Sequence, residues 1–226
     1  MNAANLKKQW RDPTFLAFVV LILTWLGTIL FIPGFDTWNH NATFLKTAAY
    51  VGMIVIGQAV CIISGGIDLS VSNVVTLSSV VAAACVKAQW GDGAAIAMAL
   101  LVSMLVGAIN ATCINFLRIP PIIMTLAMLS LLEGGMLIWT DGTPPSGCGE
   151  VIKWLCKGKP LGLPNAVFVW MLFLALGLLL MNKTKYGRHI YAVGTNEAAA
   201  KLNGVNVVAT KYLVYCVSSL CAGIGG

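Results

Sequence analysis

Long runs of apolar residues, separated by short polar segments, dominate the hydropathy pattern of this chain. No run alternates between apolar and polar positions as a half-buried strand does. Most runs approach the length of about 20 residues that a helix needs to cross a bilayer. The pattern therefore predicts an all-α, polytopic membrane protein with about seven apolar helices, forming a single domain over residues 1–226. The runs are Thr14–Ile32, Thr43–Ile63, Val71–Val86, Ala94–Leu117, Ile122–Trp139, Pro164–Met181 and Tyr212–Gly226.

The composition supports this class and changes the interpretation of the charge. Hydrophobic residues make up 58% of the chain and charged residues 10%, which lies outside the range of ordinary soluble domains. The net charge of +6 could indicate a nucleic-acid partner, but Lys and Arg cluster between the apolar runs, as the positive-inside rule describes. We therefore expect a lipid bilayer around the chain and no nucleic acid.

The distribution of basic residues predicts a cytoplasmic N-terminus. If successive loops alternate sides, nine basic residues fall inside and five outside, and the excess marks the cytoplasmic side. The first apolar run has no small-residue cleavage site after it, so we interpret it as a retained signal-anchor helix. The inner nine are Lys7, Lys8, Arg11, Arg118, Lys183, Lys185, Arg188, Lys201 and Lys211. The outer five are Lys46, Lys87, Lys153, Lys157 and Lys159.

The last apolar run, Tyr212–Gly226, is shorter than a spanning helix. It contains 15 residues, whereas a crossing needs about 20. We therefore expect the chain to be a fragment that stops inside a helix, with further helices following it in the complete protein.

One stretch between two of the runs, residues 64–73, combines a carboxylate with glycines and serines. Asp68 is the only charged residue between positions 47 and 86, and a carboxylate in hydrocarbon costs roughly 2.5–3.5 kcal/mol on insertion scales. Such a residue marks a functional position by default. The alternative is a polar turn in which Asp68 caps the following helix, and a broken helix beside a pathway satisfies both. The candidates for a translocation path or its gate are Ser64, Asp68, Ser70 and Asn73.

Three polar side chains lie inside apolar runs, namely Gln58, Asn110 and Asn115. Amide side chains in a spanning helix commonly form hydrogen bonds to neighbouring helices. We expect that role for these three in preference to sugar binding.

The polar connector at residues 183–210 is the second informative segment. Asn196 precedes Glu-Ala-Ala-Ala-Lys-Leu, which combines a capping residue with strong helix formers. Glu197 stands four residues before Lys201, a spacing that supports a helix through ion pairing, and Gly204 is placed to end it. Taken alone, such a short amphipathic helix is either a membrane-surface linker or a docking helix for a cytoplasmic partner.

Four motifs follow one another along the chain. They are Gly-Gly-Ile-Asp-Leu-Ser-Val-Ser at 65–72, Pro-Ile-Ile-Met-Thr-Leu-Ala-Met at 121–128, Tyr-Gly-Arg-His-Ile-Tyr-Ala-Val-Gly-Thr-Asn-Glu-Ala-Ala at 186–199 and Leu-Asn-Gly-Val-Asn-Val at 202–207. In this order they resemble the permease subunits of ATP-binding-cassette (ABC) sugar importers, the family of the ribose, xylose, arabinose and autoinducer-2 permeases. The resemblance covers nearly the whole chain in register and corresponds to the N-terminal two-thirds of the family fold.

This resemblance implies a multi-pass subunit of the bacterial plasma (inner) membrane, with about ten spanning helices in the full family fold. It implies that a monosaccharide is moved into the cytoplasm by a pair of permease copies, a homodimer. A separate cassette ATPase subunit would drive the movement, and an extracytoplasmic sugar-binding protein would deliver the sugar. In the family the connector with Glu-Ala-Ala is a coupling loop that docks on the ATPase. Carried over to residues 183–210, that role falls to Glu197, Ala198, Ala199 and Gly204.

Two competing functions remain open. Glu133 stands where the family often has Arg, so this position departs from the family pattern. Asp68 and Glu133 together could form the relay of an ion- or proton-coupled secondary transporter. A non-transporting membrane scaffold is the third possibility, but it leaves Asp68 unexplained.

Enzymatic motifs are lacking in the sequence. No Gly-x-x-x-x-Gly-Lys-Ser/Thr occurs, so we expect a transporter subunit without its own ATPase site and predict no catalytic residues and no cofactor. His40 and His189 lie far apart, and the seven cysteines have no metal-ligand spacing, so no metal site is predicted. Cys148 and Cys156 share one polar loop and could form a disulfide if that loop is external.

Overall fold

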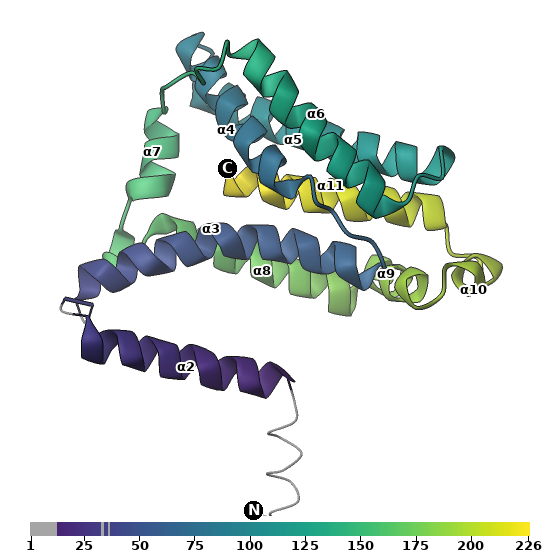
Figure 1. The fold of residues 1–226 in the computed structure, drawn as a ribbon, viewed down its shortest axis with the longest axis horizontal. Coiled ribbons are helices and arrows are strands. Elements are labelled where there is room, and N and C mark those ends of the chain that lie inside the picture. Colours follow the sequence, from purple (N-terminus) through teal and green to yellow (C-terminus); the bar gives the residue numbers. More distant parts are fainter. Residues whose placement is uncertain (1–12, 33, 36) are drawn as a thin grey trace, which may run out of the picture. The chain divides into compact units, whose positions relative to one another are not determined.

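The computed structural model describes residues 13–32, 34–35 and 37–226, apart from the side chain of Leu161. All regular secondary structure in this described part is helical (Figure 1). The predicted all-α class is therefore confirmed.

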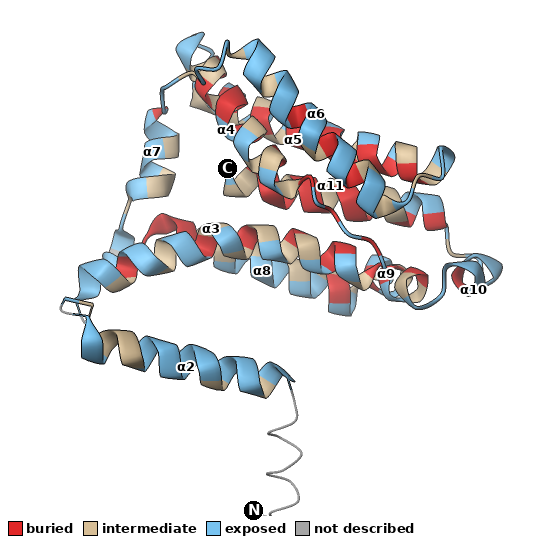
Figure 2. Ribbon diagram, viewed as in Figure 1, coloured by how far each residue is buried: buried red, intermediate tan, exposed pale blue. Residues whose placement is uncertain are grey.

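The chain divides into two compact units, the first of which is residues 1–45. This unit holds α2 (Pro13–Phe31) and the start of α3 (Trp38–Ile63). None of the 19 residues of α2 is buried (Figure 2), and a helix that is apolar on all sides suits a lipid-facing span. The rings of Phe35 and His40 pack with their centroids 4.5 Å apart, so this histidine has a structural contact at the start of α3.

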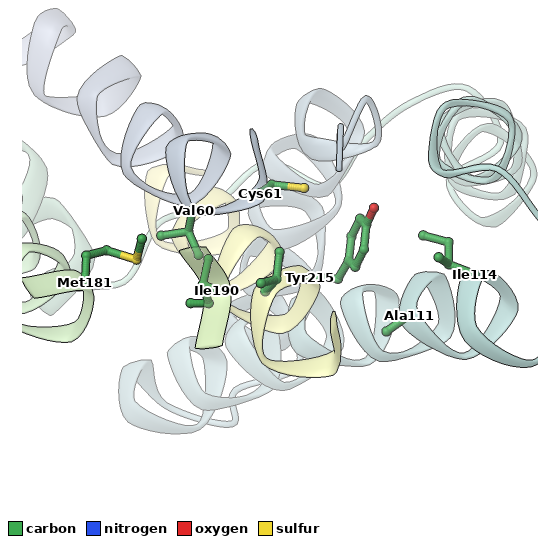
Figure 3. Close-up of a cluster of buried hydrophobic side chains, with 8 residues drawn as sticks. Val60, Cys61, Ala111, Ile114, Met181, Ile190 and Tyr215 are labelled. Carbon is green, nitrogen blue, oxygen red and sulfur yellow. The ribbon is translucent and has the colours of Figure 1, made fainter. Parts of the chain in front are cut away.

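The second unit, residues 46–226, is built around α11 (Val207–Gly225). α11 packs against α5 (Asp92–Phe116) and α4 (Val71–Lys87), and α4 and α5 also pack against each other. Buried residues occur along all three helices (Figure 2). In a bilayer such helices associate through close packing and polar contacts, because lipid tails are as apolar as the side chains. One core cluster, shown in Figure 3, contains Val60, Cys61, Ala111, Ile114, Met181, Ile190, Val214 and Tyr215.

Two further long helices, α6 (Pro121–Trp139) and α8 (Asn165–Lys183), belong to the same unit. α6 contacts α4 and α5, and its buried residues are Thr125, Met128 and Leu132. These three positions follow the helical repeat and therefore lie on one face. The other faces of α6 carry exposed leucine and isoleucine side chains, as a surface in contact with lipid does.

Six helices in the described part are long and apolar enough to cross a membrane, namely α2, α3, α5, α6, α8 and α11. α4 is a shorter apolar helix of 17 residues, and together they correspond to the seven predicted runs. The predicted start of the last run at Tyr212 is wrong, because α11 begins at Val207 and has 19 residues. Lys211 does not interrupt the helix, since its ammonium group pairs with Glu197. α11 is therefore longer than the apolar run of 15 residues, and the expectation of a fragment stays a prediction.

Three helical segments lie in connectors for which the sequence predicts none. α7 (Glu150–Lys157) and the 3-10 turn η1 (Pro160–Gly162) lie in the long polar loop. α9 (Lys185–Thr195) precedes the predicted short helix of the other connector. Prolines and glycines in the loop, and a short polar sequence in α9, hide these helices from a search for apolar periodicity.

The long polar loop is held to α5 through Asp92. The Asp92 carboxylate accepts a hydrogen bond of 2.5 Å from the backbone amide of Val151, at the start of α7. Cys148 and Cys156 are both free thiols, so the disulfide suggested for this loop is wrong. A hydrogen bond between side chain and backbone provides the connection instead.

Candidate functional site

The apolar tract is broken between the end of α3 at Ile63 and the start of α4 at Val71. Gly65 in this link has φ +81°, a conformation that glycine adopts without steric cost. Ser64 Oγ donates a hydrogen bond of 2.7 Å to the Cys61 carbonyl, which satisfies one carbonyl at the end of α3. The predicted break is therefore present, with the glycine and serine roles that its sequence indicates.

Asp68 lies in this link and is completely buried, with 0% exposure. Its Oδ1 accepts hydrogen bonds from the Ser70 amide at 3.1 Å and the Ser70 hydroxyl at 2.6 Å. Its Oδ2 accepts one of 2.9 Å from Ser218 Oγ on α11. Asn110 on α5 donates a further hydrogen bond of 3.0 Å to Ser70 Oγ. All the recorded partners of the carboxylate are neutral donors, and they connect the link to α11 and α5.

The alternative role of Asp68 as the cap of α4 is wrong. The N-cap residue of α4 is Ser70, and no side chain makes a capping hydrogen bond there. Asp68 instead bonds two residues ahead, to Ser70, and across the bundle to Ser218. The long-range partner draws the carboxylate away from the first turn of α4.

The link reaches well into the helix bundle. Ser218 lies eleven residues after Val207, which places it about 16 Å along α11 at 1.5 Å per residue. Asp68 meets Ser218 at that point along α11. At the other end of the link, Ser64 stays beside the end of α3. The break therefore begins at one end of the bundle and continues into its interior.

The other path candidates have different surroundings. Asn73 Nδ2 donates a hydrogen bond of 2.8 Å to the Leu129 carbonyl and so connects α4 to α6. Asp68 and Ser70 are in direct contact, whereas Ser64 bonds within its own helix end. The structure thus joins two of the four candidates in one hydrogen-bond network and leaves two apart.

The predicted helix of the 183–210 connector is confirmed as α10 (Glu197–Leu202). Asn196 Oδ1 accepts a hydrogen bond of 2.9 Å from the Ala199 amide, as an N-cap residue does. Gly204 follows the helix with φ +80°, the left-handed conformation common after a helix C-terminus. Ala198 and Ala199 are exposed.

The predicted ion pair of Glu197 has a different partner. Glu197 pairs with Lys211 on α11, with both carboxylate oxygens 2.9 Å from the ammonium, and no ion pair to Lys201 is recorded. Fourteen residues separate Glu197 from Lys211, so helical spacing does not reveal the pair. It connects α10 to the second turn of α11.

The same connector contacts the broken end of α3. Gly194, near the end of α9, lies so close to Ile63 and Ser64 that a side chain added there would come within 3.1 Å of the Ser64 carbonyl carbon. Only glycine permits this approach without displacing backbone. α9 also packs against α10 and α11. The connector therefore touches both sides of the site, at the end of α3 and at the start of α11.

Comparison of this chain with known proteins identifies the family to which it belongs. Residues 41–226 match the family model described as branched-chain amino acid transport system / permease component. This chain belongs to that permease family.

Named relatives agree with the motif resemblance. The Escherichia coli K12 ribose import permease RbsC is 32% identical over 225 residues, which cover 97% of this chain and 69% of RbsC. The Bacillus subtilis RbsC is 30% identical, over 92% of this chain and 64% of that protein. The E. coli K12 L-arabinose permease AraH is 32% identical, over 92% and 63%. The permease described here thus resembles members of ABC sugar importers along most of its length. No solved structure matches it.

Family membership confirms several expectations at once. The permease is a multi-pass inner-membrane transport subunit rather than an enzyme, and its family implies an ATPase and a substrate-binding protein as partners. Glu133, the departure from the family pattern, is exposed on α6. Asp68 is completely buried, so the two carboxylates proposed for a relay lie in opposite environments.

Three residues that matter to the geometry are not apparent from the sequence. Lys211 borders the last apolar run and Ser218 lies inside it, and only their long-range partners show these roles. Leu202 is 90% exposed at the end of α10, although an apolar residue in a short helix is expected to be covered.

Proposed function

We propose that the permease forms the membrane pathway of an ATP-driven importer that brings a monosaccharide, a pentose or hexose or a related sugar, into the cytoplasm. The names of its relatives support a sugar, since RbsC is a ribose permease and AraH an L-arabinose permease. A separate cassette ATPase drives the cycle, and an extracytoplasmic sugar-binding protein delivers the substrate. Two permease copies enclose the pathway as a homodimer.

The observation that carries the mechanism is a continuous set of contacts from α10 to Asp68. Glu197 on α10 holds Lys211 on α11. Lys211 and Ser218 lie seven residues apart, about two turns, so they occupy one side of α11. Ser218 then bonds to the Asp68 carboxylate in the broken link. A displacement of α10 by the ATPase is therefore transmitted along α11 to the buried link.

α10 is the docking element in this proposal. Its exposed apolar residues are Ala198, Ala199 and Leu202, whereas Ala200 is buried against the connector. Small and apolar exposed residues suit insertion into a groove of the ATPase. Gly204 ends the helix and turns the chain toward α11. Glu197 acts as a positioning residue that keeps α10 joined to Lys211.

Ser64, Asp68, Ser70 and Asn73 act as the gate of the path. Asp68 and Ser70 have 0% exposure, so they hold the gate shut through hydrogen bonds and do not touch sugar in this arrangement. Opening requires the link to separate from α11 or α5. The hydroxyl and amide groups released from Ser70 and Asn110 would then face the pathway, where sugar hydroxyls can bond to them.

The proposed orientation places the N-terminus and the 183–210 connector in the cytoplasm. Of the basic residues that support it, Lys7, Lys8 and Arg11 lie outside the described residues. The other basic residues on that side lie in the connector, near the beginning of α11 and after the end of α5. Cysteine accessibility labelling in intact cells would test it, and labelling of the connector from the outside would contradict it.

Sugar uptake by the full-length permease with its partner proteins tests the coupling role. We expect Glu197→Lys to lower ATP-driven uptake at least tenfold while membrane insertion is retained. The reciprocal exchange, Glu197→Lys with Lys211→Glu, should restore a large part of uptake because it reforms the ion pair. Glu150→Lys is the matched control, since Glu150 is an exposed acid paired with Lys153 on α7. Normal uptake in Glu197→Lys would contradict the role.

The energy source distinguishes this proposal from a secondary transporter that uses Asp68 and Glu133. Uptake that stops on ATP depletion but survives a protonophore supports the ABC importer. The opposite result would support the secondary transporter. Retained uptake in Glu133→Gln would also exclude a relay through that exposed carboxylate.

A further inference from the structure

A cavity of about 660 Å³ lies at the end of the second unit where the connector meets the helix bundle. The ends of α5, the starts of α6 and α11, the helix α10 and the beginning of the broken link all contribute to its wall. Its charged lining residues are Arg118, Lys201, Lys211 and Glu197. It is therefore a space with an excess of positive charge.

The ion pairs leave two of these cations free. Glu197 is already paired with Lys211. No ion pair is recorded for Arg118 or Lys201 within the described part of the chain. The lining thus offers a guanidinium and an ammonium to one ligand, and its charge complements an anion rather than a neutral sugar.

Two long helices begin at the same cavity. Pro120 and Pro121 at the start of α6 line it, as do Val207 and Val208 at the start of α11. Proline has no N–H group, so Pro120 and Pro121 donate nothing. The first amides of α11 have no intrahelical partner, and the helix dipole makes that end positive. Both features favour a negatively charged group, and phosphate is a common occupant of such places.

An unpartnered hydroxyl supplies an independent indication of a ligand. Tyr215 lines the cavity and is only 2% exposed, yet its hydroxyl oxygen has no hydrogen-bond partner among the described residues. Figure 3 shows Tyr215 among Cys61, Ile114 and other apolar side chains, of which only the thiol can bond, and weakly. A buried polar group without a partner is unfavourable, and an acceptor oxygen in the cavity would remove that cost.

We propose that this cavity binds a phosphate group, held by the side chains of Arg118 and Lys201 with the Tyr215 hydroxyl as a further donor. A phosphate presents several acceptor oxygens and a charge near −2, which matches two free cations and a buried hydroxyl. The group belongs either to a soluble phosphate ester or to a phospholipid headgroup. Because the bound phosphate would contact α6, α10 and α11 together, its binding restrains the 183–210 connector. The proposal concerns binding alone and does not depend on the transported substrate.

The test measures phosphate binding to the purified full-length permease in nanodiscs. In phosphatidylcholine nanodiscs, inorganic phosphate and ribose 5-phosphate are titrated calorimetrically, with ribose as the neutral control. Nanodiscs containing phosphatidylglycerol test the lipid source, with retention of that lipid on the purified permease as the readout. We expect binding of phosphate compounds or of phosphatidylglycerol, and none of ribose.

Variants show whether the binding takes place in this cavity. Arg118→Gln and Lys201→Gln should each weaken phosphate binding about tenfold. Tyr215→Phe retains the ring and should weaken it about threefold. Lys183→Gln, which removes an exposed cation of the same region outside the cavity, should leave binding unchanged.

Three outcomes would overturn the proposal. The first is absence of binding in every arm, and the second is binding that survives all three cavity variants. The third is protection of the cavity residues from chemical labelling only when the ATPase is present. In the last case an acidic segment of the ATPase is the occupant. A permease that transports sugar normally but binds no phosphate overturns this inference alone and leaves the proposed function standing.

Discussion

The hydroxyl of Ser218 donates a hydrogen bond of 2.9 Å to the carboxylate of Asp68, across 150 residues of sequence. This one contact fastens the broken link between α3 and α4 to the middle of α11. The Asp68 carboxylate is buried among neutral donors. The buried carboxylate is therefore stabilised by each of these hydrogen bonds. α11 also carries Lys211, the partner of Glu197, so one helix contacts both the proposed gate and the proposed coupling loop.

Removal of the Ser218 hydroxyl should destabilise the protein. In Ser218→Ala one carboxylate oxygen of Asp68 loses its donor, and we expect a loss of about 1–3 kcal/mol in the free energy of unfolding. Thermal unfolding in detergent, followed by tryptophan fluorescence, measures the change. Ser72→Ala is the control, since Ser72 is exposed at the start of α4. Equal melting temperatures for the two variants would contradict the role of the hydrogen bond.

The stability of Asp68 variants should follow the number of hydrogen bonds that the replacement side chain can accept. Asp68→Asn retains one acceptor oxygen for the serine hydroxyls, whereas Asp68→Ala leaves Ser70 and Ser218 without their acceptor. We therefore expect Asp68→Ala to be the less stable variant, by about 1–3 kcal/mol. The yield of folded protein and the melting temperature report the order. Asp141→Asn, at an exposed position, should behave as wild type, and a reversed order would show that charge alone matters at this position.

The cap of α10 offers a local test of the coupling helix. Asn196→Ala removes the acceptor for the Ala199 amide and should destabilise α10 by about 0.5–2 kcal/mol. Hydrogen exchange of the amides of α10 should then be faster, and ATPase association weaker. Asn196→Asp retains a capping oxygen and should exchange as slowly as wild type. Unchanged exchange in Asn196→Ala would mean that packing alone holds the helix.

Asn73 should contribute to stability through a single hydrogen bond. Asn73→Ala removes its contact with the Leu129 carbonyl, and we expect a loss of about 0.5–1.5 kcal/mol. A larger fall in sugar uptake than in melting temperature would indicate a part in the path as well. Asn182→Ala, at an exposed position near the end of α8, is the matched control. No effect on either measurement would remove Asn73 from the gate.

Much of the architecture was predictable because a helix that crosses a bilayer needs an apolar composition and a length of about 20 residues. The seven apolar runs correspond to six spanning helices and the shorter α4. α10 was predictable from its cap, its helix formers and its terminal glycine, all of which act within a few residues. α7 and α9 were not, since neither has an apolar pattern long enough to separate it from its polar surroundings.

Three features follow from the order of residues along the chain: it spans a membrane, Asp68 is an isolated carboxylate at a break, and a capped helix precedes Gly204. Each of these depends on neighbours in the chain, on composition and on the high cost of charge in hydrocarbon. Tertiary structure alone decided that Ser218 holds Asp68 and that Lys211, not Lys201, holds Glu197. Partners this far apart meet only once α11 has packed against α4 and α5, because packing and not helical spacing brings those side chains within hydrogen-bond distance.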